Sequence, residues 1–342
     1  MKLLIKDIIK ETDDAVTLCF KNGSFFNKLS YKPGQFLTIH ALIDKKIHKR
    51  AYSFSSNPVT DKDLKITIKR VEKGLVSNYV HDKLKIGDKL EIDKPAGSFY
   101  IEPKAFEEKQ YVLFAGGSGI TPMFSIVKSI LAKEKKSKVL LIYANQSESS
   151  IIFHETIKSL EVLYPNHFKV EHILSKNTVT KDNYHSGLMT KELLDTFFIK
   201  HKLAFDDHVY MICGPFGYME KVKELLKLNG IARKQIKIEV FKAPEVKLTG
   251  KKLISNVTIK LNDETHQIQV RGDQSILQKA MSENVPLPYS CRSGMCSSCK
   301  GTCVSGTIKM IDGHLLTDED VAKGDILTCV SYPESEDVVI EI

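Results

Sequence analysis

Four cysteines near the C-terminus constrain this chain more than any other feature. Three of them follow the spacing Cys291-x4-Cys296-x2-Cys299, and 29 residues separate the third from Cys329. Four thiolates can hold two irons bridged by two sulfides, and spacings this short let one loop wrap such a cluster. The pattern therefore predicts a [2Fe-2S] site. A structural zinc site is the alternative, although zinc sites with four cysteines usually contain two C-x2-C pairs, and this chain has one.

The residues between these cysteines are small or flexible, Gly294 among them, so the backbone can approach an anionic cluster closely. The stretch SCRSGMCSSCKG resembles the loop of plant-type [2Fe-2S] ferredoxins. This resemblance covers about residues 253–342 and implies a β-grasp fold there. The other cysteines nearby and upstream, Cys303 and Cys19, are expected to be packed side chains.

Composition and turn signals divide the chain into three domains. Of the 342 residues, 42% are hydrophobic and 27% are charged, as in an ordinary globular protein. Short strands with Pro and Gly turns over residues 1–106 are typical of an antiparallel β-barrel. Buried strands alternate with helices over residues 107–242, which predicts an α/β domain with a parallel sheet. Residues 243–252 have the composition of a linker, and residues 253–342 form an α+β module.

The charge is divided unevenly along the chain. Residues 253–342 contain 7 Lys and Arg against 13 Asp and Glu, whereas residues 1–252 contain 43 against 29. We expect the acidic module to dock on the basic part of the chain and then on a basic patch of a partner. The lysines are interspersed with acidic residues, so no nucleic-acid partner is expected. No apolar stretch is long enough for a membrane helix, and Asp7 and Lys10 do not fit a signal peptide, so we expect a cytoplasmic protein.

A flavin site is indicated by two motifs in the barrel. An arginine can pair with a pyrophosphate, a tyrosine can stack on an isoalloxazine, and a hydroxyl can bond the flavin N5, as in the run Arg50-Ala51-Tyr52-Ser53. The stretch GLVS opens the only helix expected there and offers free N–H groups to phosphates. PGQF, RAYS, IKRV, GLVS and PAGSF occur in the order of the ferredoxin–NADP reductase family. That resemblance implies FAD, with FMN, which relatives of the same module order use, as the alternative. The implied flavin contacts are Arg50, Ala51, Tyr52, Ser53, Lys69, Gly74, Leu75, Val76 and Ser77.

A nicotinamide coenzyme site is indicated by a glycine-rich turn between a buried strand and a helix. Glycines here let backbone amides cradle a pyrophosphate. The turn is not the Rossmann fingerprint, because Pro122 replaces its third glycine. It resembles the same family's coenzyme loop, and Cys213-Gly214-Pro215 resembles that family's second coenzyme motif. The implied contacts are Gly116, Gly117, Ser118, Gly119, Thr121, Gly214 and Pro215.

Three polar groups converge on one ring system by the same resemblance: Ser53, Cys213 and Glu239. Hydride transfer needs no nucleophile, so their expected task is to position the nicotinamide, relay a proton and stabilise charge. A buried, purely structural Cys213 is the alternative. Phe241 matches the aromatic residue that flanks the flavin in the family, although here the chain continues past it.

The sequence leaves the choice between NADH and NADPH open and favours NADH. A 2′-phosphate needs a cation, and Gln146 stands where an arginine is expected after the strand VLLIYA. Phe153 and His154 resemble the adenine-stacking and basic positions of NADPH users, but packing on a helix face explains Phe153 equally well.

Together these motifs predict a reductase. Hydride carries two electrons and an iron–sulfur cluster takes one at a time, and a flavin can mediate between them. The chain resembles reductase components of bacterial oxygenases with a C-terminal ferredoxin domain, those of phenylacetyl-CoA epoxidase, hydroxylases and hybrid-cluster proteins among them. This implies electron flow from NAD(P)H through FAD and [2Fe-2S] to an acceptor redox protein, such as an oxygenase. A stand-alone diaphorase or flavin reductase is the alternative; a binding module without chemistry is disfavoured by the intact motifs.

Overall fold

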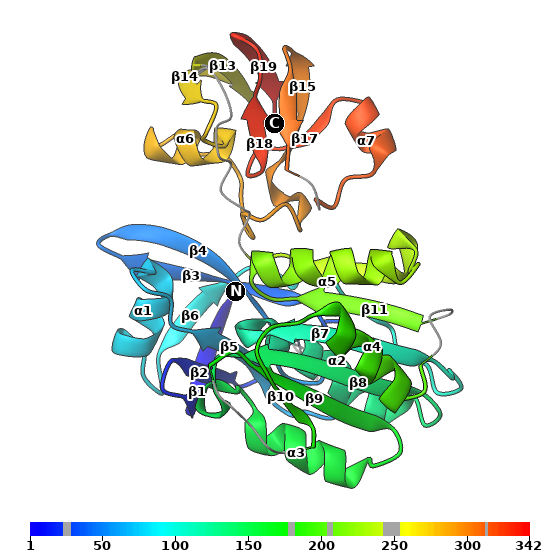
Figure 1. Cartoon of the computed structure of the whole chain (residues 1–342). Coiled ribbons are helices and arrows are strands. Elements are labelled where there is room, and N and C mark those ends of the chain that lie inside the picture. The colour runs from blue at the N-terminus through cyan, green and yellow to red at the C-terminus, as the bar shows by residue number, and fades with distance from the viewer. Residues whose placement is uncertain (23–28, 177–181, 204–207, 242–253, 312–313) are drawn as a thin grey trace. The chain divides into compact units, whose positions relative to one another are not determined.

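The computed structural model describes residues 1–22, 29–176, 182–203, 208–241, 254–311 and 314–342, and the linker predicted at 243–252 lies outside them. The chain divides into two compact units, Met1–Glu239 and Val240–Ile342 (Figure 1). No helix in the described part of the chain is long and apolar enough to cross a membrane.

The first part of the larger unit is the predicted antiparallel barrel. Its strand order is β4-β3-β6-β1-β2-β5, and every neighbouring pair is antiparallel. A bridge between Phe54, just after β4, and Ile66 on β5 joins the two edge strands and closes the barrel. The elements are β1 Lys2–Thr12, β2 Ala15–Phe20, β3 Phe36–Ile43, β4 Lys46–Ser53, β5 Leu64–Lys69, α1 Leu75–Lys83 and β6 Lys89–Ile92.

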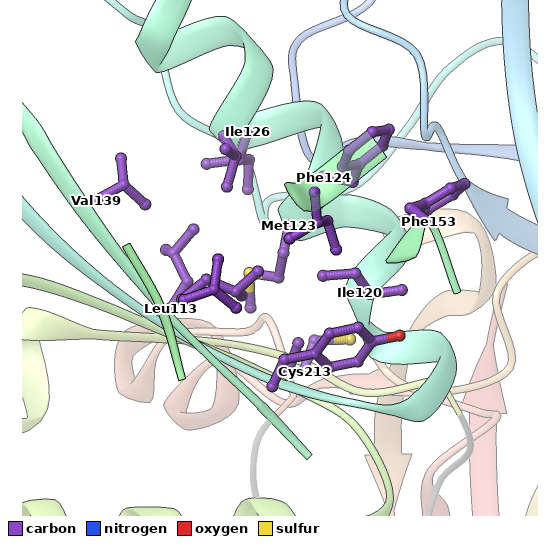
Figure 2. Close-up of a cluster of buried hydrophobic side chains, with 14 of the residues drawn as sticks. Leu113, Ile120, Met123, Phe124, Ile126, Val139, Phe153 and Cys213 are labelled. Atoms are coloured by element: carbon purple, nitrogen blue, oxygen red, sulfur yellow. The ribbon is translucent and has the colours of Figure 1, made fainter. Parts of the chain in front are cut away.

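The second part is the predicted parallel sheet, with the order β10-β9-β8-β7-β11-β12. Its strands are β7 Gln110–Gly116, β8 Lys138–Asn145, β9 Phe168–Leu174, β10 Tyr184–Ser186, β11 His208–Cys213 and β12 Ile236–Glu239. Its helices are α2 Ile120–Lys133, α3 His154–Leu163, α4 Lys191–Lys200 and α5 Phe216–Leu228. In Figure 1, α5 and α3 lie on opposite sides of the sheet. Figure 2 shows the hydrophobic core against α2, in which Met123, Ile126 and Leu113 belong to one cluster. The rings of Phe124 and Phe153 are stacked, with their centroids 4.3 Å apart.

A buried carboxylate ties three elements of this domain together. Glu171 on β9 accepts hydrogen bonds from His201 Nε2 at 2.6 Å, His185 Nε2 at 2.7 Å and Lys200 Nζ at 2.8 Å. Burial acts to raise the pKa of Glu171, but these three donors outweigh it and lower the pKa to about 2. Glu171 is therefore ionised at neutral pH and links β9 to β10 and to the C-terminal end of α4.

The smaller unit has the mixed sheet of a ferredoxin domain, in the order β14-β13-β19-β15-β17. The strands β13 and β14 form an antiparallel hairpin, and β19, the last strand of the chain's described part, runs parallel to β13. The elements are β13 Ile254–Leu261, β14 Glu264–Arg271, α6 Ile276–Ser282, β15 Lys300–Ser305, β16 Ile308–Met310, α7 Asp318–Ala322, β17 Asp325–Leu327, β18 Ser331–Pro333 and β19 Asp337–Glu341. The buried side of α6 packs in the core of this sheet through Ile276, Leu277 and Ala280.

Candidate functional site

The predicted flavin motif lies at the end of β4. Ser53 is the last residue of the strand and is buried. Tyr52 is half-buried, and burial raises the pKa of its phenol to about 12, so the ring is neutral and suited to stacking. Tyr52 shares one hydrophobic cluster with Val76 and Val80 of α1. The structure thus brings the strand end and the predicted phosphate-binding helix into the same part of the barrel.

The N-terminus of α1 has the local geometry of an anion site. Ser77 Oγ accepts a hydrogen bond from the Val71 amide at 3.1 Å and donates one to the Gly74 carbonyl at 3.2 Å, which fixes the entry to the helix. A Cβ on Gly74 would lie 2.5 Å from Ser77 Oγ, so this entry has no room for a side chain. The first amides of the helix have no carbonyl partner within it and can bind a phosphate. Lys69, also predicted to bind the flavin, lies with its Nζ 3.3 Å from Asp14 Oδ2.

The two coenzyme motifs pack backbone against backbone. They follow β7 and β11, which are neighbours in the parallel sheet, so their carboxyl ends meet at one edge. A Cβ on Gly119 would lie 2.1 Å from the Cys213 carbonyl oxygen, and a Cβ on Gly214 would lie 3.0 Å from Gly116 Cα. Thr121 Oγ1 donates to the Ser118 carbonyl at 3.1 Å and closes the turn at the start of α2. The close approach of the main chains therefore requires glycine at position 119, and a side chain at position 214 would force its neighbours to move by a few tenths of an ångström.

Cys213 and Glu239 lie side by side at the same edge. They are register partners on β11 and β12, and both are buried. Burial raises the pKa of the Cys213 thiol, and the nearby Glu239 carboxylate raises it further. Cys213 is therefore a neutral thiol at physiological pH, which suits a positioning or packing role and not nucleophilic attack. Phe241, two residues past β12, is 41% exposed.

A cation that was not predicted from the sequence, Lys176, lies beside Gln146, the position at which the choice between NADH and NADPH was expected to be decided. The amides of Ser175 and Lys176 donate to the carbonyls of Asn145 at 3.0 Å and Gln146 at 2.9 Å. This places Lys176, two residues after β9, beside Gln146, the first residue after β8, and Glu148 lies in the short helical turn that follows Gln146. The basic residue after the strand FKVEHIL was the available signal. It was not predicted because Lys176 follows a different strand from Gln146, and only the pairing of β8 with β9 brings the two strand ends together.

Phe153 and His154 are both engaged within the protein. Phe153 is buried in the core against Phe124, which is the packing alternative weighed for it above (Figure 2). His154 Nε2 lies 2.6 Å from the Tyr184 hydroxyl and shares a hydrogen bond with it.

The four predicted cluster ligands, which are four of the five cysteines in the smaller unit, are grouped in pairs. Hydrogen bonding from Cys291 lowers the pKa of Cys296 to about 5, and hydrogen bonding from Cys329 lowers the pKa of Cys299, so Cys291 and Cys296 are neighbours, as are Cys299 and Cys329. No three His, Cys, Asp or Glu side chains among the described residues surround a single ion position. Two pairs of thiols match two irons with two protein ligands each better than they match one tetrahedral zinc. The Ser293 amide points at Cys291 Sγ from 3.4 Å, as expected for a loop that hydrogen-bonds to cluster sulfurs.

Family profiles match three successive parts of the chain. Residues 2–101 match the oxidoreductase FAD-binding domain, residues 113–224 the oxidoreductase NAD-binding domain, and residues 259–334 the 2Fe-2S iron-sulfur cluster binding domain. These matches confirm the predicted cofactors, FAD, NAD(P)H and [2Fe-2S], in the predicted order.

Two curated relatives span nearly the whole chain. The ferredoxin reductase component of 3-ketosteroid-9-alpha-monooxygenase from Rhodococcus rhodochrous is 32% identical, covering 99% of this chain and 96% of its own length. One of the subunits of 1,2-phenylacetyl-CoA epoxidase from Escherichia coli K12 is 30% identical, with the same coverage of 99% and 96%. The solved structure of phthalate dioxygenase reductase aligns with a TM-score of 0.66 at 24% identity, over 100% of this chain and 98% of its own, and shares the fold.

Proposed function

The chain belongs to the ferredoxin–NADP reductase-type family of oxygenase reductases that carry a C-terminal 2Fe-2S domain, and on that premise we propose how its residues serve electron transfer. The reaction class is an NAD(P)H-dependent flavin and iron–sulfur oxidoreductase that supplies an acceptor protein. The observation that carries the proposal is the presence, on one chain, of a coenzyme turn, a flavin-type strand end and four cysteines in two pairs.

We propose domain limits of 1–106, 107–242 and 253–342, with residues 243–252 as the linker. The three family profiles fall inside these limits, which supports them. None of the seven cysteines is paired in a disulfide, and a reducing compartment keeps cysteines in this state, so we propose a cytoplasmic location.

Each cofactor has residues of suitable chemistry. The flavin accepts a hydride and passes on single electrons when bound. Arg50 and the α1 N-terminus, from Gly74 to Ser77, would hold its phosphates, while Tyr52 and Ser53 would contact its ring. The turn Gly116–Thr121, together with Gly214 and Pro215, would hold the coenzyme pyrophosphate. Cys291, Cys296, Cys299 and Cys329 would ligate the cluster.

Cys213 and Glu239 act beside the coenzyme ring in this proposal. The neutral thiol offers a small, polarisable surface with a weak S–H donor, and the carboxylate offers an acceptor or a proton-holding group at the same edge. Ser53 completes the set from the barrel side by donating or accepting one hydrogen bond. None of these roles requires covalent chemistry, so all three residues orient, and none attacks.

NADH is the coenzyme favoured by the specificity region. A carboxylate near the adenosine ribose accepts hydrogen bonds from its 2′-hydroxyl and repels a 2′-phosphate, and Glu148 stands in the turn after β8. Among the described residues, Lys176 is the one cation that main-chain hydrogen bonds place beside Gln146. It would therefore account for any residual use of NADPH.

The acceptor is an oxygenase or hydroxylase component with a basic docking face. The curated relatives named above are the ferredoxin reductase component of a ketosteroid monooxygenase and a subunit of a phenylacetyl-CoA epoxidase. The 2Fe-2S domain of this chain is acidic, and α7 carries Asp318, Glu319 and Asp320 in its first turn. Complementary charge speeds association and selects partners.

Anaerobic visible spectroscopy tests the proposal. We expect flavin and cluster absorption to bleach together on addition of NADH and more slowly with NADPH. A purified protein that lacks cluster absorption and binds zinc would contradict the ligand assignment.

The Cys296→Ser variant separates the reductase from the diaphorase alternative. It should keep flavin-dependent reduction of ferricyanide, lose the cluster signal and lose transfer to protein acceptors. Unchanged transfer to a protein acceptor would instead support a diaphorase. Cys303→Ser, on β15 outside the two pairs, is the matched control and should retain the cluster.

A further inference from the structure

One face of α2 is tied to the loop that follows β4. Ser125 Oγ donates to the Ser56 carbonyl at 2.6 Å, and Ser129 Oγ donates to Asn57 Oδ1 at 3.1 Å. Between them in sequence, Lys128 Nζ donates to Asp61 Oδ2 at 2.6 Å. Residues three and four apart lie on one side of a helix, so these donors act together. We call the group the α2 latch; its members are Ser56, Asn57, Asp61, Ser125, Lys128 and Ser129.

The four Ser and Asn members of the latch are buried, its Lys128–Asp61 pair is largely buried, and its loop side is held by further hydrogen bonds. The side chains of Lys128 and Asp61 are 15% and 22% exposed, whereas surface ion pairs are mostly open to water. Asp61 Oδ2 also accepts from the Asn57 amide at 2.9 Å, and the Asp61 amide donates to the Asn57 carbonyl at 3.0 Å. Ser56 Oγ shares a 2.5 Å hydrogen bond with the Tyr31 hydroxyl. Neither side of the latch can move without breaking several buried hydrogen bonds, which is costly.

The latch connects the two reacting parts of the site by a short route. Its loop begins immediately after Ser53, at the end of the flavin-side strand, and Ser56 follows three residues later. Its helix begins immediately after the Gly117–Gly119 turn, and Ser125 follows four residues after Thr121. A shift of α2 relative to the loop therefore carries the coenzyme turn with it relative to the strand end.

We propose that Lys128 and Asp61 are positioning residues that set the spacing between the flavin-side strand end and the coenzyme turn, and thereby the geometry of hydride transfer. The inference rests on the proposed function. The two residues are not assigned to either the coenzyme or the flavin site; they act through α2 and the loop. Hydride transfer is sensitive to such spacing, since a misplacement of about 1 Å can cost about a hundredfold in rate.

The test uses the full-length holoprotein and the variants Lys128→Met and Asp61→Asn. Lys133→Met, an exposed lysine at the end of the same helix, is the matched control. Stopped-flow absorbance gives the rate constant of flavin reduction and the coenzyme dissociation constant, with NADH and with NADH deuterated at the transferred position. Hydrogen exchange followed by mass spectrometry reports residues 54–61 and 117–125.

We expect both latch variants to slow flavin reduction about tenfold to a hundredfold, with the dissociation constant changed less than about threefold. The deuterium isotope effect should change and exchange should rise in both segments, while Lys128→Arg recovers part of the rate and Lys133→Met behaves as wild type. A reduction rate within twofold of wild type would overturn the proposal, whether or not exchange rises, because the latch would then be structural only.

Two further outcomes are decided in the same assay. If Lys128→Met does not retain flavin, the milder Asp61→Asn and Ser129→Ala variants give the answer, since they nearly preserve side-chain volume. If neither NADH nor NADPH reduces the flavin of the wild-type protein, the proposed function is refuted but the latch is not. In that case, unchanged hydrogen exchange in the latch variants would refute the latch separately.

Discussion

Replacing Gly119 by alanine tests whether the two coenzyme motifs require main-chain contact. The new Cβ would lie 2.1 Å from the Cys213 carbonyl oxygen and 2.4 Å from its carbonyl carbon, and real Cβ atoms essentially never approach closer than 3.0 Å. The two main chains must therefore separate by at least about 0.9 Å. Cys213 cannot yield easily, because β11 is hydrogen-bonded between β7 and β12. Overpacking of this kind costs about 1–3 kcal/mol of stability, and a displacement near 1 Å can cost about a hundredfold in hydride-transfer rate.

The assay compares Gly119→Ala with Gly217→Ala. Gly217 lies on α5, and a Cβ added there would meet no atom of a neighbouring element within 4 Å. Thermal unfolding should show a Tm several degrees lower for Gly119→Ala and unchanged or slightly higher for Gly217→Ala, because alanine favours a helix. Flavin reduction by NADH should be slower by one to two orders of magnitude in Gly119→Ala alone. If Gly119→Ala had wild-type Tm and reduction rate, the packing of the two motifs would not constrain the site.

Three further predictions concern charge. Glu171, with its pKa lowered to about 2, stabilises the fold above its ordinary pKa near 4.5, and this contribution is lost as pH falls from about 4.5 towards about 2. Glu171→Gln should therefore reduce the free energy of unfolding by on the order of 3 kcal/mol at pH 7, and by much less at pH 3, in denaturant titrations; an equal loss at both pH values would contradict the charge argument. Lys176→Met should lower kcat/KM for NADPH about fivefold and leave kcat/KM for NADH nearly unchanged, whereas Glu148→Arg should raise kcat/KM for NADPH. Equal effects on kcat/KM for both nucleotides would show that these residues do not determine coenzyme specificity. Raising ionic strength from about 20 to about 300 mM should slow electron transfer to the acceptor while ferricyanide reduction stays constant, and a salt-independent rate would rule out electrostatic docking.

Local spacing predicted the features that depend on local geometry. The cysteine spacing alone indicated a cluster, since the first three ligands lie on one loop. The glycine turn before α2 was recognised because glycine, strand and helix are contiguous in sequence. The reason Gly119 must be glycine was not predictable, because the clashing atom belongs to Cys213 on another strand.

Features set by strand register were missed. Lys176 lies beside Gln146 only because β8 and β9 are parallel neighbours in a particular register. The latch joins residues 67 to 72 positions apart, and in sequence Ser125 and Lys128 look like any helix face. Helical periodicity tells which residues share a face, but it does not tell what that face meets.

The division of the chain into two units matches two different demands on geometry. Hydride transfer needs reacting atoms in near contact, so the flavin-side strand end and the coenzyme turn must be held to a fraction of an ångström. Both lie in the unit Met1–Glu239, where glycine crossings and the latch leave little freedom. Delivery of single electrons to a separate acceptor protein needs an exposed, charged module that can meet a partner. The acidic unit Val240–Ile342 is a separate compact body, so its surface can be adapted to an acceptor without disturbing the packing that hydride transfer requires.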